Sequence, residues 1–299
     1  MTARGAAETI AGVRVSNPDK VFWPEEGYTK RDVVAFYADV FARLKPYVKD
    51  RLLSLERCPD GMKGSCFFQK EAPKGLPPDT PTKPVQHSNK VTNYVVGGKL
   101  ETQLALANLG CIALHVWGSR QHAPRKPDWV CFDLDPDTGE FADAIPAALR
   151  VKEALDALEL ESFVKTSGGK GIHVFIPIKA GPDADDALAF AERLGTHLSN
   201  AYPKQFTMES RIADRKGRVY LDPFRNGFAQ TVVAPYSVRR KPKAPFSMPL
   251  AWKQVKAGLD HTRFNLGTHR KVLAGPDPWA DFWASRQSLA RALAAVKRL

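Results

Sequence analysis

The sequence predicts a mixed α/β fold, and three observations support this prediction. Short runs of alternating apolar residues, at 130–134, 172–176 and 219–221, indicate strands with at least one buried face. An apolar stripe at helical spacing from Val33 to Leu44 is typical of an amphipathic helix. Predicted strands and helices alternate along the chain, which favours sheets covered by helices.

The elements follow in chain order. Residues 1–12 are expected to form a flexible leader, and a strand and a turn follow it at 12–18. Thr29 is predicted to cap a helix that ends near Lys45, because its hydroxyl can accept from the free backbone N–H groups of the first turn. Further helices are predicted at about 102–108, 143–158, 185–200 and 279–299, and further strands at 94–96 and 112–117.

Residues 13–299 are expected to form one domain in three consecutive parts. These are an N-terminal module at about 13–100, a core at about 101–240 and a C-terminal segment at about 241–299. Within the first part, residues 71–90 are rich in proline and are expected to form a long functional loop.

Composition limits the classes of function. The chain has 299 residues, 43% of them hydrophobic, which is enough for a sizeable core and argues against global disorder. Its net charge of +12 favours a polyanionic partner without identifying it. The sequence contains no apolar run long enough to predict a signal peptide or a membrane span.

The four cysteines include no Cys-x-x-Cys pair, which argues against a zinc ribbon. Cys111 and Cys131 lie in apolar runs and are predicted to be buried. This usage fits a reducing compartment, and we expect a cytoplasmic protein.

Acidic residues close two of the predicted strands. Asp133 and Asp135 share the face opposite to Phe132, and Asp222 ends a second alternating run. Three converging carboxylates suit a pair of magnesium or manganese ions in phosphoryl or nucleotidyl transfer. An Asp-x-Asp at a strand end is also typical of a turn or a helix cap, and these residues alone leave that interpretation open.

A glycine loop joins two further predicted strands, at 165–177. Its three glycines permit close backbone approach, and Ser167, Lys170 and His173 surround them. The spacing is not that of a Walker A motif. A plain hairpin turn would explain the glycines but not the serine, lysine and histidine.

Other candidate residues are weaker when each is taken alone. Arg239 heads a basic run at a predicted strand end, where its guanidinium could grip a phosphate. Phe67 and Phe68 must face opposite sides of a strand, so one can be core while the other forms a stacking platform for a base. Lys20 and Lys30 have no feature that separates them from ordinary surface lysines, and a histidine at 115 among apolar neighbours is more often structural.

Taken together, these motifs resemble one family. The chain resembles the polymerase domain of bacterial ATP-dependent DNA ligase D, a member of the archaeo-eukaryotic primase superfamily that acts in non-homologous end joining. The resemblance runs in order from about residue 13 to 270 and is carried by Asn17-Pro18-Asp19-Lys20, Phe67-Phe68-Gln69-Lys70, Leu114-His115-Val116, Phe132-Asp133-Leu134-Asp135-Pro136, Thr166-Ser167-Gly168-Gly169-Lys170-Gly171-Ile172-His173, Leu221-Asp222 and Ala234-Pro235-Tyr236-Ser237-Val238-Arg239.

The resemblance implies a primase-like catalytic core with an RRM-like sheet and an N-terminal α/β module. It also implies a role for each matching residue. The implied metal ligands, for two Mn²⁺ or Mg²⁺ ions, are Asp133, Asp135 and Asp222. The implied nucleotide ligands are His115, Ser167, Lys170, His173 and Arg239. Lys20 and Lys30 resemble the pocket for a DNA 5′-phosphate, Phe67 and Phe68 the template-stacking rings, and Arg215 more loosely a template or nucleotide contact.

The implied activity is addition of ribo- or deoxyribonucleotides to a primer 3′-hydroxyl at DNA gaps and double-strand-break ends. Implied partners are DNA with gaps, 5′-phosphate ends or 3′ overhangs, NTPs or dNTPs, Ku and an ATP-dependent DNA ligase, with the protein on the bacterial nucleoid when bound to DNA. No phosphoesterase or ligase module accompanies the match, so a stand-alone enzyme and an excised domain both remain open. Alternative functions are primase-type initiation, a non-catalytic DNA-end-binding scaffold and a manganese-dependent glycosyltransferase.

Overall fold

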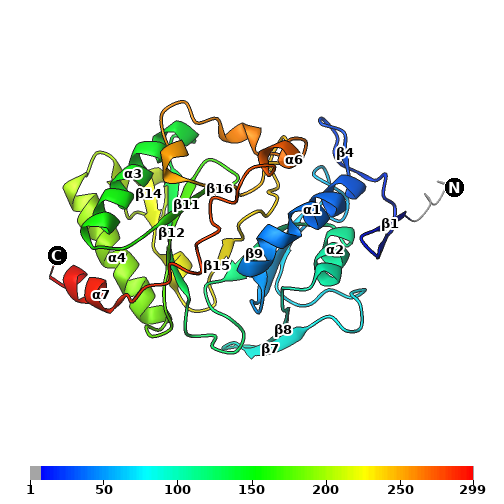
Figure 1. Cartoon of the computed structure of the whole chain (residues 1–299), viewed down its shortest axis with the longest axis horizontal. Coiled ribbons are helices and arrows are strands. Elements are labelled where there is room, and N and C mark those ends of the chain that lie inside the picture. Colours follow the sequence, from blue (N-terminus) through cyan, green and yellow to red (C-terminus); the bar gives the residue numbers. More distant parts are fainter. Residues whose placement is uncertain (1–7, 299) are drawn as a thin grey trace. The chain divides into compact units, whose positions relative to one another are not determined.

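A computed structural model describes residues 8–298, and the chain divides into two units that are interleaved in sequence (Figure 1). Unit 1 comprises Met1–Trp117, Val233–Ser247 and Thr262–Gly275. Unit 2 comprises Gly118–Val232, Met248–His261 and Pro276–Leu299. This division differs from the three consecutive parts expected from the sequence, because segments after residue 232 return to unit 1.

Unit 1 is built on a four-stranded sheet of order β15-β9-β5-β6, with three two-stranded pairs, β1-β2, β3-β4 and β7-β8. Its strands are β1 (Glu8–Ile10), β2 (Val13–Val15), β3 (Val21–Trp23), β4 (Tyr28–Thr29), β5 (Leu53–Arg57), β6 (Phe67–Gln69), β7 (Thr82–Gln86), β8 (Val91–Val95) and β9 (Cys111–Trp117), and the chain re-enters the unit within β15 (Thr231–Val233). Its helices are α1 (Lys30–Val48), α2 (Leu100–Asn108) and α6 (His269–Val272).

Helix α1 begins where the sequence predicted. The Thr29 hydroxyl accepts from the backbone of Asp32, whose carboxylate accepts from the backbone of Thr29 in return. Val33, Val40 and Leu44 of the apolar stripe are buried, so this face of α1 belongs to the core.

Two sequence expectations in unit 1 were wrong. Of the expected leader, residues 1–7 lie outside the described part of the chain, but Glu8–Ile10 form β1 and pair with β2. Within the expected loop at 71–90, Thr82–Gln86 form β7, which pairs antiparallel with β8. Pro84 is tolerated there because β7 is an exposed edge strand, where a proline need not donate to a ladder.

A disulfide that the sequence did not predict joins Cys58 to Cys66 in unit 1. The two residues flank the loop between β5 and β6, so the bond closes this hairpin just before Phe67. Cys111 and Cys131 are free and buried, as the sequence predicted.

Unit 2 contains a six-stranded sheet of order β13-β14-β10-β12-β11-β16, antiparallel except for β13 with β14. The strands are β10 (Trp129–Pro136), β11 (Phe163–Thr166), β12 (Ile172–Pro177), β13 (Phe206–Thr207), β14 (Val219–Asp222) and β16 (Pro249–Leu250). The helices are α3 (Phe141–Ala157), α4 (Ala184–Ala201), α5 (Ile212–Arg215) and α7 (Ala290–Val296), with 3₁₀ turns η1 (Phe224–Asn226), η2 (Trp252–Gln254) and η3 (His261–Arg263), the last at the boundary of the units.

The two faces of this sheet differ. Helices α3 and α4 flank one face (Figure 1), where Phe132 of β10 meets Phe190 of α4 edge-on at 6.3 Å between ring centroids. On the other face, Phe175 packs against Trp279 at 5.4 Å. That second face therefore has an aromatic end, and its remaining positions carry the polar residues described below.

The C-terminal helix is shorter than the expected 279–299. Residues from Trp279 form turns, because Trp279 and Phe282 stack at 4.8 Å and the Trp279 indole donates to the Val164 carbonyl. Regular helix starts only at Ala290. Across residues 8–298, no helix is both long and apolar enough to cross a membrane.

A candidate active site on the six-stranded sheet

The three aspartates predicted from the sequence meet on the polar end of the second face. Asp133 on β10 lies directly opposite Asp222 on β14, and Asp135 lies opposite Tyr220 two residues along. Side chains two apart on a strand point to the same face, so the three carboxylates share it. Asp133 and Asp222 are 6% and 7% exposed, so this charge is held largely away from water.

Arg225, which the sequence analysis missed, bridges two of these carboxylates. Its Nε lies 3.1 Å from Asp133 Oδ2 and 3.1 Å from Asp222 Oδ2. The residue sits in η1, which follows β14 directly and turns the side chain back over the strand end. Its position three residues after Asp222 was the available sequence signal.

His173 lies against the carboxylate oxygen of Asp133 that Arg225 does not contact. It faces Asp133 across β12 and β10, and its Nε2 lies 3.0 Å from Asp133 Oδ1. Lys165 on β11 in turn faces His173. The sequence analysis assigned no role to Lys165, although the hairpin closed by residues 167–171 places it in register with His173.

The electrostatics of the aspartates diverge because their neighbours differ. Burial acts to raise the pKa of Asp133, but His173 and Arg225 outweigh it and hold this pKa well below its usual range. The charge of Asp133, followed by burial, raises the pKa of Asp135 to about 7. Burial also raises the pKa of Asp222, against the opposing effect of Arg225.

These residues fit a divalent ion in charge and in donor chemistry. Three carboxylates and one bridging guanidinium leave the cluster with a net negative charge, and the pKa of Asp135 is raised because of its carboxylate neighbour Asp133. Carboxylate oxygens are ligands that suit magnesium or manganese. As the side chains are placed, no three His, Cys, Asp or Glu groups within residues 8–298 already form a metal cage. Arg225 occupies the position between Asp133 and Asp222 instead.

The glycine loop packs against this cluster. The Ser167 hydroxyl accepts from the backbone N–H groups of Gly169 and Gly171, both at 3.1 Å, so the loop closes on its own serine. A Cβ at Gly171 would lie 2.5 Å from the Leu134 carbonyl and 3.1 Å from Asp135 Oδ1. Glycine is therefore required at 171 for the loop to approach β10.

Two further predicted residues lie close to the cluster in unit 2. The Lys170 ammonium lies against Gly139, in the turn that follows β10. The Arg215 guanidinium lies 4.3 Å above the Tyr220 ring and lowers the pKa of Asp135 electrostatically, though less than Asp133 raises it. Unit 2 thus gathers the three aspartates, Ser167, Lys170, His173 and Arg215.

The remaining predicted residues belong to unit 1. Lys30 is 6% exposed and its Nζ donates to the Ser16 carbonyl at 2.8 Å, while Lys20 pairs with Asp60. Burial, and then the charge of Lys20, lowers the pKa of Lys30, and the Lys30 backbone N–H donates to the Lys20 carbonyl at 2.8 Å, so the two residues are neighbours. A close pair of cations is suited to bind a phosphate.

Both phenylalanines are exposed, at 45% for Phe67 and 62% for Phe68, whereas one of them was expected in the core. The reason is that β6 is the edge strand of its sheet. Arg57 lies 5.6 Å from the Phe67 ring centroid, and Phe68 meets His115 edge-on at 5.3 Å. Arg239 follows a bridge between Val238 and Phe246, not the expected strand.

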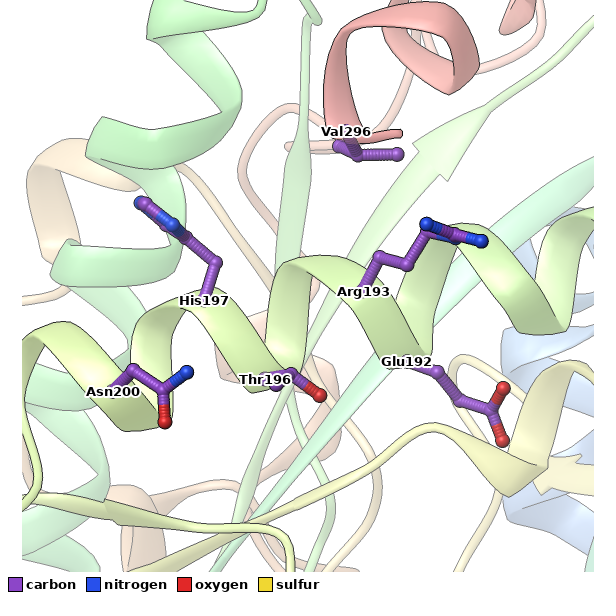
Figure 2. A pocket seen from close by; sticks show the side chains of 6 residues that line it. All are labelled: Glu192, Arg193, Thr196, His197, Asn200 and Val296. Carbon is purple, nitrogen blue, oxygen red and sulfur yellow. The ribbon is translucent and has the colours of Figure 1, made fainter. Parts of the chain in front are cut away.

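A shallow hollow of about 270 Å³ lies elsewhere in unit 2, between the outer side of α4 and Val296 of α7 (Figure 2). Its lining from α4 includes Glu192, Arg193 and His197. It shares no residue with the carboxylate cluster, and we assign it no role.

Comparisons with known proteins agree with one another. A family model, the LigD primase-polymerase domain, matches residues 29–279. The multifunctional non-homologous end joining protein LigD of Pseudomonas aeruginosa is 30% identical over 297 residues, which cover 98% of this chain and 35% of that protein. The bifunctional non-homologous end joining protein LigD of Bacillus subtilis is 29% identical, over 90% of this chain and 44% of that protein.

Among solved structures, the polymerase domain of Mycobacterium tuberculosis ligase D in complex with DNA matches with a TM-score of 0.76 and 25% identity. The match covers 95% of this chain and 94% of that one. The chain therefore spans less than half the length of these LigD relatives but nearly the whole of a solved polymerase domain.

Proposed function

We infer the function of this chain from its family: it belongs to the LigD primase-polymerase domains and is a nucleotidyltransferase of the DNA/RNA polymerase type. The mixed α/β fold predicted from the sequence is confirmed by the same match. The reaction in detail, its ions and its partners are proposals.

The proposed reaction adds ribo- or deoxyribonucleotides to a primer 3′-hydroxyl at gaps and at double-strand-break ends. The observation that supports it most is the pairing of Asp133 with Asp222 across adjacent strands, with Asp135 beside them on the same face. Such a buried acidic cluster is costly unless cations neutralise it, and nucleotidyl transfer requires cations at that place.

Asp133, Asp135 and Asp222 would hold two Mn²⁺ or Mg²⁺ ions. When bound, such ions neutralise the triphosphate and favour ionisation of the attacking hydroxyl. The chain's own groups would position the nucleotide: Lys170 supplies a point charge to the phosphates, and Ser167 fixes the glycine loop through its two backbone hydrogen bonds. His115 and Arg239, in unit 1, retain their proposed nucleotide-binding role, and Arg215 its proposed contact to template or nucleotide.

We propose that DNA is recognised by groups of unit 1. Lys20 and Lys30 form a pair of ammonium groups that suits a 5′-phosphate. Phe67 and Phe68 present exposed rings on which template bases could stack. Since the relatives are named for non-homologous end joining, we also propose action in that repair route, with Ku and an ATP-dependent DNA ligase as partners.

A 5′-phosphorylated gapped duplex with Mn²⁺ and either rNTPs or dNTPs tests this function. We expect the protein to extend the primer and the Asp133→Ala variant to lose extension while still binding the duplex. Asp281→Ala, on an exposed residue of the same unit, is the matched control and should extend normally. Normal extension by Asp133→Ala would overturn the assignment, and synthesis without any primer would favour primase-type initiation.

A further inference from the structure

The side chain of Asn226 ties the turn η1 to strand β10. Its Oδ1 accepts from the backbone N–H of Cys131 at 2.8 Å, and its Nδ2 donates to the Cys131 carbonyl at 2.8 Å. Nδ2 also donates to the Pro223 carbonyl at 2.9 Å. Asn226 is 8% exposed, so these bonds are held away from water. The orientation of the amide follows from its partners, because a backbone N–H can only donate and a carbonyl can only accept.

The two bonds to Cys131 continue the ladder between β10 and β14 beyond its last residue pair. The ladder ends where Asp133 lies opposite Asp222, and Cys131 is two residues further along β10. In an antiparallel ladder, a hydrogen-bonded residue exchanges both its N–H and its C=O with its partner. The backbone has already left β14 at this point, and the Asn226 amide supplies the acceptor and the donor in its place.

Arg225 depends on this tether more than Asp222 does. Asp222 is fixed in the ladder, and its Oδ1 accepts from the backbone of Phe224 at 2.9 Å. Arg225 lies three residues beyond the ladder, in η1, so strand pairing does not hold its backbone. The bonds from the next residue, Asn226, to β10 therefore set where the Arg225 guanidinium lies. That guanidinium reaches Asp133 Oδ2 with its Nε at 3.1 Å.

We propose that Asn226 is a positioning residue, which holds the Arg225 guanidinium between Asp133 and Asp222 as a built-in cation that the divalent ion must displace. This inference rests on the proposed function, because it concerns the ion of the proposed reaction. Asn226 acts on ion binding through Arg225, since its own amide is occupied by backbone groups. Loss of Asn226 releases the guanidinium and thereby favours the ion.

The chain offers a matched control in Gln287. Its side chain makes the same kind of pair with the backbone of Glu161: Oε1 accepts from the N–H at 3.0 Å, and Nε2 donates to the carbonyl at 2.8 Å. The Gln287 backbone N–H donates to the carbonyl of Pro177, which is the end of β12 remote from the carboxylates. Replacing either amide removes a side-chain tether, whereas an effect through Arg225 follows only from replacing Asn226.

Thermal unfolding in EDTA tests the link to Arg225 without any ion. The proteins compared are the unmodified chain, Asn226→Leu, Arg225→Gln and the double variant. Both substitutions remove the same bridge, so we expect their losses of Tm to be clearly less than additive. Gln287→Leu combined with Arg225→Gln should be additive, because the two sites share no partner. Additive losses for Asn226→Leu with Arg225→Gln would overturn the proposal.

Binding of Mn²⁺ alone gives a second readout. Arg225→Gln removes a positive charge beside the ion, and we expect it to tighten Mn²⁺ binding about 10-fold. Asn226→Leu should also tighten binding, and the double variant should bind no more tightly than Arg225→Gln. Gln287→Leu should bind Mn²⁺ as the unmodified protein does. Weaker or unchanged Mn²⁺ binding by Asn226→Leu would overturn the proposal.

A second substitution, Asn226→Gln, covers the case that the leucine variant does not fold. It keeps the amide but adds one methylene, so the amide can pair with Cys131 only if η1 shifts. Its loss of Tm in EDTA should again be less than additive with that of Arg225→Gln. Additive losses would count against the proposal as they would for the leucine variant.

These outcomes are separable from failure of the proposed function. If the unmodified protein does not extend a primer but both readouts behave as expected, the polymerase assignment fails and the positioning role stands. If extension occurs and the losses of Tm are additive, the positioning role fails alone.

Discussion

Arg225 is predicted to compete with the divalent ion for the carboxylate cluster. Its guanidinium bridges Asp133 and Asp222, so it supplies positive charge where the ion is proposed to bind. Replacing it by glutamine removes that charge while keeping a polar side chain. We expect Arg225→Gln to be less stable than the unmodified protein in chelator, and to gain more stability from Mn²⁺.

The size of the effect follows from the exposures of the three groups. The Asp133 and Asp222 side chains are 8% and 9% exposed, and breaking a buried ion pair costs about 3–5 kcal/mol. The Arg225 side chain is 38% exposed, so water screens part of the attraction, and we expect a loss of about 2 kcal/mol. For a protein of 299 residues that corresponds to a Tm lower by roughly 3 °C.

The assay is thermal unfolding of the unmodified protein and of Arg225→Gln, each in EDTA and in Mn²⁺. Arg193→Gln, on an exposed arginine of α4, is the control and should unfold like the unmodified protein in both conditions. Equal Tm values for Arg225→Gln and the unmodified protein in EDTA would refute the bridging role. An equal Mn²⁺ gain in both proteins would refute the competition.

Three further predictions concern other parts of the molecule. In chelator, the pKa of Asp135 is raised to about 7, so the folded protein binds more protons than the unfolded chain between about pH 4 and 7 and loses stability as the pH rises through that range. Asp135→Asn removes this carboxylate and should therefore raise Tm more at pH 7.5 than at pH 5. A gain in Tm that is independent of pH would contradict the raised pKa. Lys30→Met should weaken binding to a 5′-phosphorylated gap about 10-fold, the value of one charge-assisted hydrogen bond, and leave an unphosphorylated gap unaffected; equal loss on both duplexes in a titration would remove the phosphate pocket. Gly171→Ala should lower Tm and nucleotide affinity because its Cβ would lie 2.5 Å from the Leu134 carbonyl. Gly169→Ala is the control and should lower neither, because its Cβ would meet only Ser167 Oγ, at 3.5 Å. Equal effects of the two substitutions on nucleotide binding would argue against the close contact at Gly171.

Alternation and capping were enough to predict several elements of the fold and the face on which each aspartate lies, whereas the meeting of Asp133 with Asp222 depends on the pairing of β10 with β14. The alternation of apolar and polar residues at 130–134 and 219–221 predicted both strands and the face on which their aspartates lie. Thr29 predicted the start of α1. Local patterns succeeded at these positions because the side chains that decide the structure lie within one element.

Features that depend on distant pairing were not predictable in the same way. Residues 82–86 look like loop because of their proline, and their strand exists through pairing with β8. Arg225 and Lys165 carry no motif of their own. Arg225 reaches Asp133, 92 residues earlier, only because β14 pairs with β10, and Lys165 meets His173 only through the register of β11 with β12. The Cys58–Cys66 bond likewise depends on the approach of β5 and β6 in the hairpin.

The interleaving of the two units has a consequence for dissecting the protein. The chain passes from one unit to the other five times, at 117/118, 232/233, 247/248, 261/262 and 275/276. No single truncation can then release either unit by itself, since any end fragment that contains the whole of one unit also carries segments of the other. A half-enzyme for biochemical work would have to be spliced from three pieces with designed linkers, and a protease nick at one crossing should leave fragments that copurify.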